Sequence, residues 1–260
     1  GKYWPRFMKA SSLMDKCVLV VRPLRRQDDF LLLLEQSLAS VIHTPIMTIE
    51  PILDSHQIKQ KILAFDQFDI AIFVSVNAAE IGMKWLDRYW PMLPLDMEYY
   101  AIGGQTAQLV VDYTQTVNCP IDQITSEGLL TLPKLKDLEN KSVIIFRGGQ
   151  GRETLKQGLI SRGATVEYCD LYRRAVDQKQ VDVTRQQLTE VDCLVAHSAE
   201  LLEAIGPIDE IRGDKTINHL PVVVPSNRVA ETAKSLGYSP VIVADSAMPE
   251  SMYAALQKVF

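Results

Sequence analysis

The sequence predicts an α/β protein that consists of two parallel-sheet domains and arose by internal duplication. Short runs of β-branched residues alternate with amphipathic stretches along the chain, which is typical of a parallel sheet covered by helices. Separated blocks in the first half resemble blocks in the second half at a nearly constant offset. The length of 260 residues exceeds the usual size of one domain and leaves room for two.

The expected strands are short apolar runs that end at turn-forming residues. They are Cys17–Val21, Ser40–Pro45, Ile70–Val74, Tyr99–Ile102, Ser142–Phe146, Ala164–Cys169, Asp192–Ala196, Pro221–Val224 and Val241–Val243. Helices are expected in most of the gaps, one beginning near Asp28 and another opening at Ser126. This order of elements favours parallel sheets over hairpins.

The duplication is clearest around one pair of serines. The segment FDIAIFVSVNAAEI resembles VDCLVAHSAELLEAI, which places Ser75 on Ser198 (198 − 75 = 123). The earlier part of each half aligns at a nearby offset and places Arg22 on Arg147 (147 − 22 = 125). Because the register holds over several blocks, we favour a duplication over chance similarity between two α/β sequences.

Composition excludes several classes of function. The chain has 47% hydrophobic and 23% charged residues, as ordinary globular proteins do, and no apolar run approaches the about 18 residues of a spanning helix. The net charge of −5 argues against a general nucleic-acid binder. The four cysteines lack C-x-x-C spacing and the histidines are scattered, so we expect reduced thiols and no bound metal. Residues 1–16 lack the apolar segment of a secretion signal, which predicts a cytoplasmic location.

A glycine-rich turn is the first candidate for ligand binding. The stretch VIIFRGGQGRE carries Arg147, Gly148, Gly149 and Arg152 between a strand and a helix. Glycines let backbone N–H groups approach an anion and arginines add charge-assisted hydrogen bonds, which favours a carboxylate or phosphate site. A plain strand-to-helix turn explains the same glycines. A dinucleotide site is a weaker alternative, because the spacing is not G-x-G-x-x-G and no Walker lysine follows.

Hydroxyl side chains recur where the predicted strands end. They are Ser75, Thr106, Ser198 and Ser226. The carboxyl ends of parallel strands face the ligand crevice, which makes these residues candidate ligand contacts. Each is equally suited to cap a helix, and the two roles are compatible because a capped N-terminus still presents N–H groups.

Tyr172 is the candidate proton donor. It lies beside Arg173 and Arg174, and a phenol there can protonate a leaving group while the cations modulate its acidity. A buried structural tyrosine beside solvated arginines is the alternative. No Ser-His-Asp or Cys-His arrangement is recognisable, and the lone His197 is expected to be held by packing or capping.

Two extended segments mark places where the chain can cross between domains. Pro45 and Pro51 bracket the first, and Asp170–Val176 is the corresponding part of the second copy. Crossing at both predicts a discontinuous domain, built from the first strands and the C-terminal third of the chain. A simple division near Leu135 is the alternative.

Several motifs form an ordered set along the chain. They are LVVRP at Leu19–Pro23, IFVSVNA at Ile72–Ala78, AIGGQTA at Ala101–Ala107, TSEGLL at Thr125–Leu130, IIFRGGQGRETL at Ile144–Leu155, LYRR at Leu171–Arg174 and VVPSNRVA at Val223–Ala230. Together they resemble the uroporphyrinogen-III synthase family, from about Cys17 to the end of the chain.

The resemblance implies two flavodoxin-like, internally duplicated α/β domains joined by a two-stranded linker. It selects the discontinuous division: residues 15–44 and 176–260 in domain 1, 52–171 in domain 2, and linkers at 45–51 and 172–175. The implied enzyme is a cyclising lyase of heme biosynthesis. It dehydrates and closes hydroxymethylbilane, with inversion of the terminal pyrrole ring, to uroporphyrinogen III, and it uses no metal or organic cofactor.

The resemblance also assigns site residues, by matching positions. Tyr172 matches the family's tyrosine and is the implied general acid. The implied substrate contacts are Arg22, Ser75, Thr106, Arg147, Gly148, Gly149, Arg152, Ser198, Ser226 and Arg228. The active site is expected in the cleft between the domains. The implied partner is the linear tetrapyrrole, with no nucleic acid and no membrane; a monomer is expected, and a transient contact with the enzyme that makes hydroxymethylbilane stays open.

Two functions from other classes remain as alternatives. One is a non-catalytic two-domain binder that closes on a small polyanion. The other is a nucleotide-dependent α/β enzyme that uses the turn at residues 148–151. Neither a signal peptide nor an attached DNA-binding segment, which would favour the binder, is recognisable in the sequence.

Overall fold

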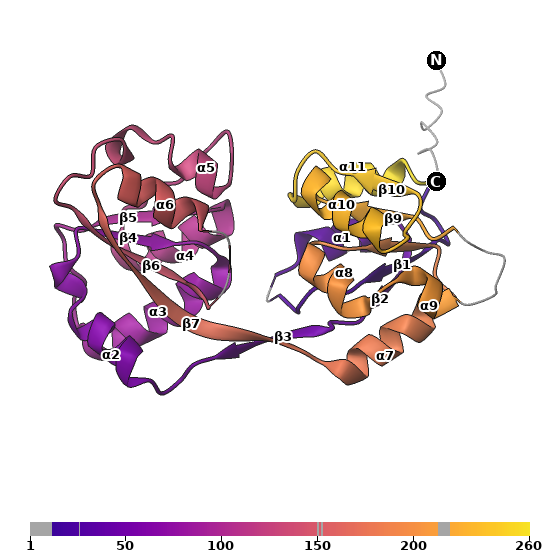
Figure 1. Ribbon diagram of the computed structural model, residues 1–260, viewed down its shortest axis with the longest axis horizontal. Coiled ribbons are helices and arrows are strands. Elements are labelled where there is room, and N and C mark those ends of the chain that lie inside the picture. The colour runs from indigo at the N-terminus through magenta and orange to yellow at the C-terminus, as the bar shows by residue number, and fades with distance from the viewer. Residues whose placement is uncertain (1–11, 26, 150, 152, 213–218) are drawn as a thin grey trace, which may run out of the picture. The chain divides into compact units, whose positions relative to one another are not determined.

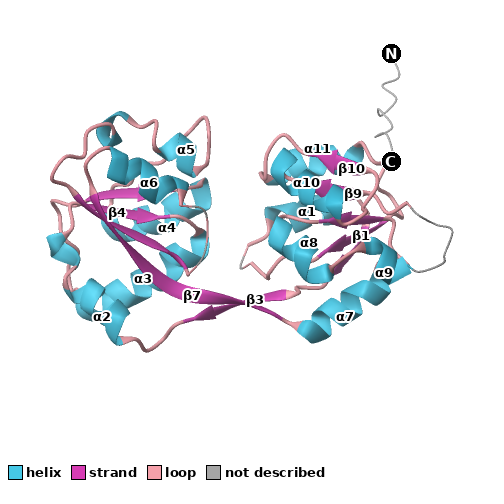
Figure 2. Cartoon of the chain, viewed as in Figure 1, coloured by secondary structure: helices cyan, strands magenta, loops and turns pink. Residues whose placement is uncertain are grey.

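The structure is a computed structural model that describes residues 12–25, 27–149, 151, 153–212 and 219–260. The chain divides into two compact units (Figure 1). Unit 1 comprises Gly1–Thr48 and Ala175–Phe260, and unit 2 comprises Ile49–Arg174. The first unit is therefore discontinuous in the sequence. Helices and strands alternate along the chain in both units (Figure 2).

The sheet of unit 1 has five parallel strands in the order β10-β9-β8-β1-β2. They are β1 (Cys17–Val20), β2 (Ser40–His43), β8 (Cys193–Val195), β9 (Val222–Val224) and β10 (Val241–Val243). Numbered within the unit, the spatial order is 2-1-3-4-5, which is the order of flavodoxin-like folds. The fold class predicted from the sequence is confirmed for this unit.

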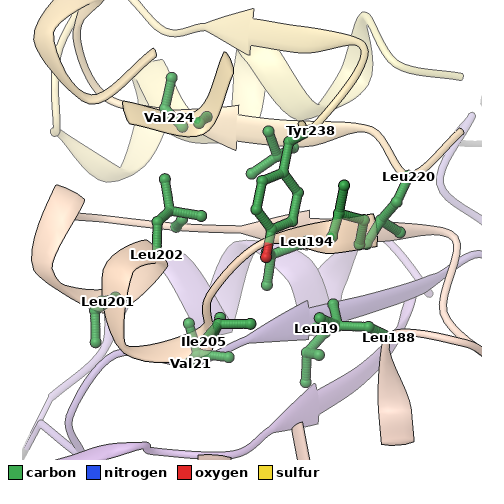
Figure 3. Close-up of a cluster of buried hydrophobic side chains, with 14 of the residues drawn as sticks. Leu19, Val21, Leu188, Leu194, Leu201, Leu202, Ile205, Leu220, Val224 and Tyr238 are labelled. Carbon is green, nitrogen blue, oxygen red and sulfur yellow. The ribbon is translucent and has the colours of Figure 1, made fainter. Parts of the chain in front are cut away.

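Helices cover both faces of this sheet because its strands are apolar on both sides. The helices of unit 1 are α1 (Asp29–Gln36), α7 (Gln178–Gln187), α8 (Ala199–Ile205), α9 (Ile208–Arg212), α10 (Asn227–Ser235) and α11 (Pro249–Gln257). Val18 and Val20 pack with residues of α1 and α11. Leu19 and Val21 point to the other face and pack with residues of α7, α8 and α10 (Figure 3). The unit thus has two hydrophobic layers around one sheet.

Unit 2 repeats four of these parallel strands, and its fifth strand pairs at the opposite edge of the sheet. Its sheet has the order β3-β7-β6-β4-β5. The strands are β3 (Met47–Pro51), β4 (Ile70–Phe73), β5 (Glu98–Ala101), β6 (Ser142–Gly148) and β7 (Thr165–Val176). The helices are α2 (His56–Leu63), α3 (Val76–Tyr89), α4 (Gly104–Thr114), α5 (Ser126–Leu129) and α6 (Thr154–Ser161). Residues of α2, α3 and α4 pack on one face of the sheet, and residues of α5 and α6 on the other.

The strand registers confirm the internal duplication. In unit 1, Val18 of β1 pairs with Cys193 of β8. The equivalent positions at the offsets of 125 and 123 residues are Val143 and Ile70, and these two residues pair in unit 2. The remaining parallel ladders follow the same offsets. Each unit therefore combines the first two strands of one copy with the later strands of the other.

Strands β3 and β7 form the predicted two-stranded connection. They are neighbours in the sheet, and each crosses the boundary between the two units. The N–H of Ile52 donates to the carbonyl of Leu171 at 2.9 Å, and the N–H of Asp177 donates to that of Ile46 at 2.8 Å. Residue numbers rise along one segment while those of their hydrogen-bond partners fall along the other, so the two segments run antiparallel. The sequence predicted a strand ending at Cys169, whereas β7 continues to Val176 because β3 pairs with its second half.

Candidate functional site

The site of unit 2 centres on Tyr172, near the end of β7. Its side chain is largely buried, and its phenolic oxygen lies 3.2 Å from the hydroxyl oxygen of Ser75. Ser75 follows β4 and caps helix α3, accepting a hydrogen bond from the N–H of Ala78 at 3.1 Å. A serine hydroxyl that accepts one bond still has its own hydrogen to donate. The phenol is therefore held at the N-terminus of a 14-residue helix.

Gly148 and Gly149 lie against the same tyrosine. Gly148, the last residue of β6, is the ladder partner of Tyr172, and the register between β6 and β7 shifts at this point. The N–H of Gly149 donates to the backbone carbonyl of Tyr172 at 3.3 Å. This amide is occupied within the protein, so the turn offers fewer backbone donors to an anion than the sequence suggested.

Arg147 is engaged by its own neighbours. Its Nε donates to Asp170 at 2.8 Å, and a guanidinium nitrogen lies 3.7 Å from Glu153. The guanidinium carbon lies 3.3 Å from the centroid of the Tyr168 ring. Burial raises the pKa of Tyr168 to about 12, against the opposing effect of Arg147. The charge of Arg147 is thus balanced by carboxylates on either side, and direct contact with a substrate stays a prediction.

Arg22 repeats this arrangement in unit 1. It is buried and forms an ion pair with Asp28, which also caps α1 by accepting from the N–H of Leu31 at 3.0 Å. Burial lowers the pKa of Arg22, and Asp28 opposes this shift. Arg22 and Asp28 lie 125 positions before Arg147 and Glu153. Both units therefore have an ion pair between an arginine and an acid at the equivalent strand-to-helix turn.

Three of the predicted hydroxyl contacts cap helices. Ser75, Ser198 and Ser226 accept hydrogen bonds from the first turns of α3, α8 and α10. Both roles considered from the sequence are compatible with this geometry, and the capping role is observed. Contact with a ligand stays a prediction for all three.

The start of α4 is different because it has no side-chain cap. Its N-cap residue, Gly103, has a φ of +97° and takes the place that Ser226 has in unit 1. Among the described residues, no side chain accepts a hydrogen bond from the N–H groups at the start of this 11-residue helix, which is the geometry that binds anions. Thr106 lies in this first turn and is buried, so contact of its hydroxyl with a substrate stays a prediction.

The two remaining predicted contacts are arginines. Arg228 is exposed in the first turn of α10, and among the ion pairs of the described residues none involves it. A cation at a helix N-terminus opposes the helix dipole, so a carboxylate ligand would relieve an unfavourable position. Arg152 lies outside the described residues.

A cavity beside Tyr172 brings in Lys61, which sequence reasoning missed. It has a volume of about 380 Å³, and its lining includes Lys61, Asp170 and Arg173 together with Tyr172. Lys61 comes from α2 and donates a hydrogen bond to the backbone carbonyl of Tyr168. No motif marks Lys61, because its position depends on how α2 packs against the edge of the sheet.

His197 is a second feature that the sequence did not reveal. Its ring packs edge-on against Phe30, with 5.4 Å between the centroids. Packing was the expected role, but both ring nitrogens are buried and lack a hydrogen-bond partner in the described part of the chain. Burial lowers the pKa of His197 well below its ordinary value, and the positive charges of Arg22 and Arg25 act in the same direction.

The cysteines add little to the site. Cys169 and Cys193 are buried, Cys17 and Cys119 are partly exposed, and all four are free thiols. Within the described ranges, no three His, Cys, Asp or Glu side chains are grouped to hold a metal ion. No helix in these ranges is long and apolar enough to cross a membrane.

Two flavodoxin-like units that share exchanged strands, with polar turns where the strands end, define an internally duplicated two-unit α/β protein. Comparison with known protein families identifies the family to which this protein belongs. The model of the family described as uroporphyrinogen-III synthase HemD matches residues 28–254. The chain belongs to the uroporphyrinogen-III synthase family.

Curated relatives agree with this assignment. The chain is 30% identical over 247 residues to the uroporphyrinogen-III synthase of Escherichia coli K12, covering 92% of this chain and 99% of the relative. It is 31% identical over 196 residues to that of Salmonella typhimurium LT2, covering 73% and 78% respectively.

Solved structures of the family share the fold. A mutant uroporphyrinogen III synthase from the extremely thermophilic bacterium Thermus thermophilus aligns with a TM-score of 0.62 at 19% identity, covering 94% of this chain and 98% of that one. The uroporphyrinogen-III synthetase of Helicobacter pylori 26695 aligns with a TM-score of 0.57 at 14% identity, covering 95% and 100%. At these identities the likeness concerns the fold alone.

Proposed function

We propose that this chain is a uroporphyrinogen-III synthase, which closes hydroxymethylbilane to uroporphyrinogen III with loss of water and inversion of the terminal pyrrole ring. Family membership supports the reaction. The observation that carries the proposal is the phenol of Tyr172, held 3.2 Å from the hydroxyl of Ser75 at the start of α3. A positioned phenol supplies the proton that the departing hydroxyl group needs.

In the proposed reaction, Tyr172 protonates the hydroxyl group on the substrate's hydroxymethyl carbon. The carbon–oxygen bond breaks, water leaves, and an azafulvene cation forms with help from the pyrrole nitrogen's electron pair. Attack by the substituted carbon of the last ring gives a spiro intermediate. The bond from this carbon to its original methylene bridge then breaks, which forms a second azafulvene cation on the neighbouring ring. That methylene carbon bonds to the unsubstituted α-carbon of the last ring, which inverts the ring. After ring closure a pyrrole carbon loses a proton, which returns to the phenolate, so one water is released and the enzyme is regenerated.

The local electrostatics support this role for Tyr172. Negative charge that develops on the phenolic oxygen lies at the N-terminus of α3, where a helix dipole contributes about 0.3–1 kcal/mol. Ser75 can donate its remaining hydrogen to the same oxygen, which stabilises the phenolate further.

We propose that the substrate's eight carboxylates are bound by the turns at the strand ends. The uncapped start of α4 and the exposed Arg228 are the two best supported contacts. The hydroxyls of Ser75, Ser198 and Ser226 and the first-turn N–H groups of their helices are further candidates. Flexible linear tetrapyrroles also close without inversion, so holding the carboxylates in one geometry is part of the proposed catalysis.

We further propose that the protein acts as a cytoplasmic monomer on this small molecule, without a nucleic-acid partner. The net charge of −5 supports the last point. Light scattering at micromolar concentration measures the oligomeric state, and a mass of twice that of the chain would contradict the monomer.

The direct test is to supply freshly made hydroxymethylbilane and to resolve the oxidised products by isomer. We expect the type III isomer to form faster than spontaneous closure gives the type I isomer. Formation of type I alone, at the spontaneous rate, would exclude the proposed function. Boiled protein is the matched control, because it retains any small molecule carried through purification.

A further inference from the structure

The ladder between β6 and β7 is regular until its last step. Arg147 pairs with Asp170, but the next residue of β6, Gly148, pairs with Tyr172 rather than with Leu171. Two residues of β7 therefore stand opposite one residue of β6, which defines a β-bulge. Bulges of this kind redirect a side chain because they interrupt the alternation of faces along a strand.

The bulge changes the face on which Tyr172 lies. Tyr168 packs against the cluster that contains α5 and α6 residues, whereas Cys169 and Leu171 belong to the cluster with α2 and α3 residues. Regular alternation would place Tyr172 on the face of Tyr168. Instead Tyr172 belongs to the same cluster as Leu171. Only on that face does its hydroxyl meet Ser75, which begins α3.

Gly148 provides the space that this orientation requires. A Cβ atom at position 148 would lie 2.3 Å from Cε2 and 2.6 Å from Cζ of the Tyr172 ring. Both distances are far below van der Waals contact, and a rigid aromatic ring has no flexible end that can move aside. The ring therefore lies directly against the backbone of β6, and any side chain at position 148 displaces it.

The first copy of the repeat lacks both the glycine and the tyrosine. At the offset of 125 residues, Gly148 corresponds to Pro23 and Tyr172 corresponds to Met47. The regular ladder between β1 and β2 ends with Val20 opposite His43, before the positions equivalent to the bulge. The glycine and the tyrosine are therefore specific to unit 2.

We propose that Gly148 is a positioning residue, which together with the bulge aims the Tyr172 hydroxyl at Ser75 and so sets the geometry of proton transfer. The kinetic part of this inference rests on the proposed function, whereas the geometric part does not. Gly148 acts through the tyrosine ring and not by binding substrate with its own backbone.

The test compares Gly148→Ala with Gly158→Ala. A Cβ at position 158 would lie 2.6 Å from a Leu130 side-chain carbon in the same unit, so Gly158→Ala introduces a similar overlap that does not involve Tyr172. We expect Gly148→Ala to lower kcat at least tenfold while KM changes less than threefold. We expect Gly158→Ala to leave both constants near wild type, whatever stability it loses.

A double-mutant cycle separates positioning from a general loss of structure. In a Tyr172→Phe background the hydroxyl is absent, so adding Gly148→Ala should lower kcat no further than twofold. If Gly148→Ala is as harmful there as in wild type, or if it resembles Gly158→Ala, the positioning role is wrong. If Gly148→Ala fails to fold, Tyr172→Ala should restore folding by vacating the space, and a double variant that stays unfolded overturns the proposal.

A substrate-free measurement keeps this inference distinct from the proposed function. In protein labelled with 13C at the tyrosine Cζ, the Tyr172 signal is identified by its loss in Tyr172→Phe. We expect Gly148→Ala to shift this signal and Gly158→Ala to leave it in place. If the wild-type protein lacks synthase activity, the proposed function is wrong, but the shift still tests whether Gly148 positions the ring of Tyr172. An unshifted signal in Gly148→Ala would remove the inference alone.

Discussion

The phenolic oxygen of Tyr172 and the hydroxyl oxygen of Ser75, 3.2 Å apart, join the second half of strand β7 to the start of helix α3. The two residues come from different copies of the duplicated sequence, one from the second strand of copy 2 and one from the turn after a strand of copy 1. Because the copies exchange their first strands, neither copy could form this contact within itself.

Replacing Tyr172 by Phe tests the proton-donor role. We expect kcat to fall about 10²- to 10⁴-fold, the usual contribution of a general acid, with little change in KM or in thermal stability. Tyr168→Phe is the matched control, because it removes a phenol from the same strand. The hydroxyl of Tyr168 donates to Glu153 and not to Ser75. Steady-state assays with isomer analysis measure both. Equal rates in the two variants would rule out Tyr172 as the acid.

Replacing Ser75 by Ala separates the cap from the contact with the tyrosine. Loss of the cap should lower the free energy of unfolding by about 1 kcal/mol. Loss of the bond to Tyr172 should also lower kcat, because the phenolate loses a donor. Ser55→Ala is the control, since Ser55 caps α2 through the N–H of Ile58. We expect urea denaturation to give similar losses for both, and a kcat loss for Ser75→Ala alone.

The fold was largely predictable because its signals are local. Short β-branched runs marked the parallel strands, and the repeat predicted which strands are equivalent. The residues alone predicted only an extended segment at β3, and the family resemblance made it one strand of a two-stranded linker. Its sequence, MTIEP, alternates polar and apolar residues and ends in proline, and it becomes a strand through pairing with β7. Such pairing depends on tertiary structure and leaves little trace in the segment itself.

The site was less predictable for two physical reasons. Alternation along β7 points Tyr172 to the wrong face, and a bulge that corrects this leaves no signature in a single sequence. The arginines were read as free cations, although a signal was present. Aligning the copies at 125 residues places Asp28 on Glu153, which reveals an acid six positions after each arginine.

The duplicated arginine–acid pairs should differ in strength because their burial differs. The side chains of Arg22 and Asp28 are 4% and 8% exposed, whereas Glu153 is 53% exposed. Asp28→Asn keeps a capping side chain but leaves a buried cation unpaired, which should cost about 3–5 kcal/mol. Glu153→Gln at the equivalent position should cost less than about 1 kcal/mol. Equal losses in urea denaturation would contradict a structural role for Arg22 that depends on its buried acid.

His197 should make unit 1 sensitive to acid. Because its pKa in the folded protein is lowered well below the ordinary value of 6.5, the unfolded chain binds a proton more readily than the folded one. The contribution of His197 to the free energy of unfolding is therefore fully present above pH 6.5. It is lost as the pH falls, by up to about 1.4 kcal/mol for each pH unit until the folded-state pKa is reached.

The charged groups around His197 leave protonation without compensation. Arg22, Arg25 and His43 all oppose a positive charge on the ring, and Asp28, the acid beside Arg22, is already paired with that arginine. His197→Phe removes the titrating group while keeping an aromatic ring beside Phe30. We expect the free energy of unfolding of this variant, measured in urea between pH 7.5 and pH 5, to fall less steeply than that of wild type. Parallel curves for the two proteins would mean that other groups cause the acid sensitivity.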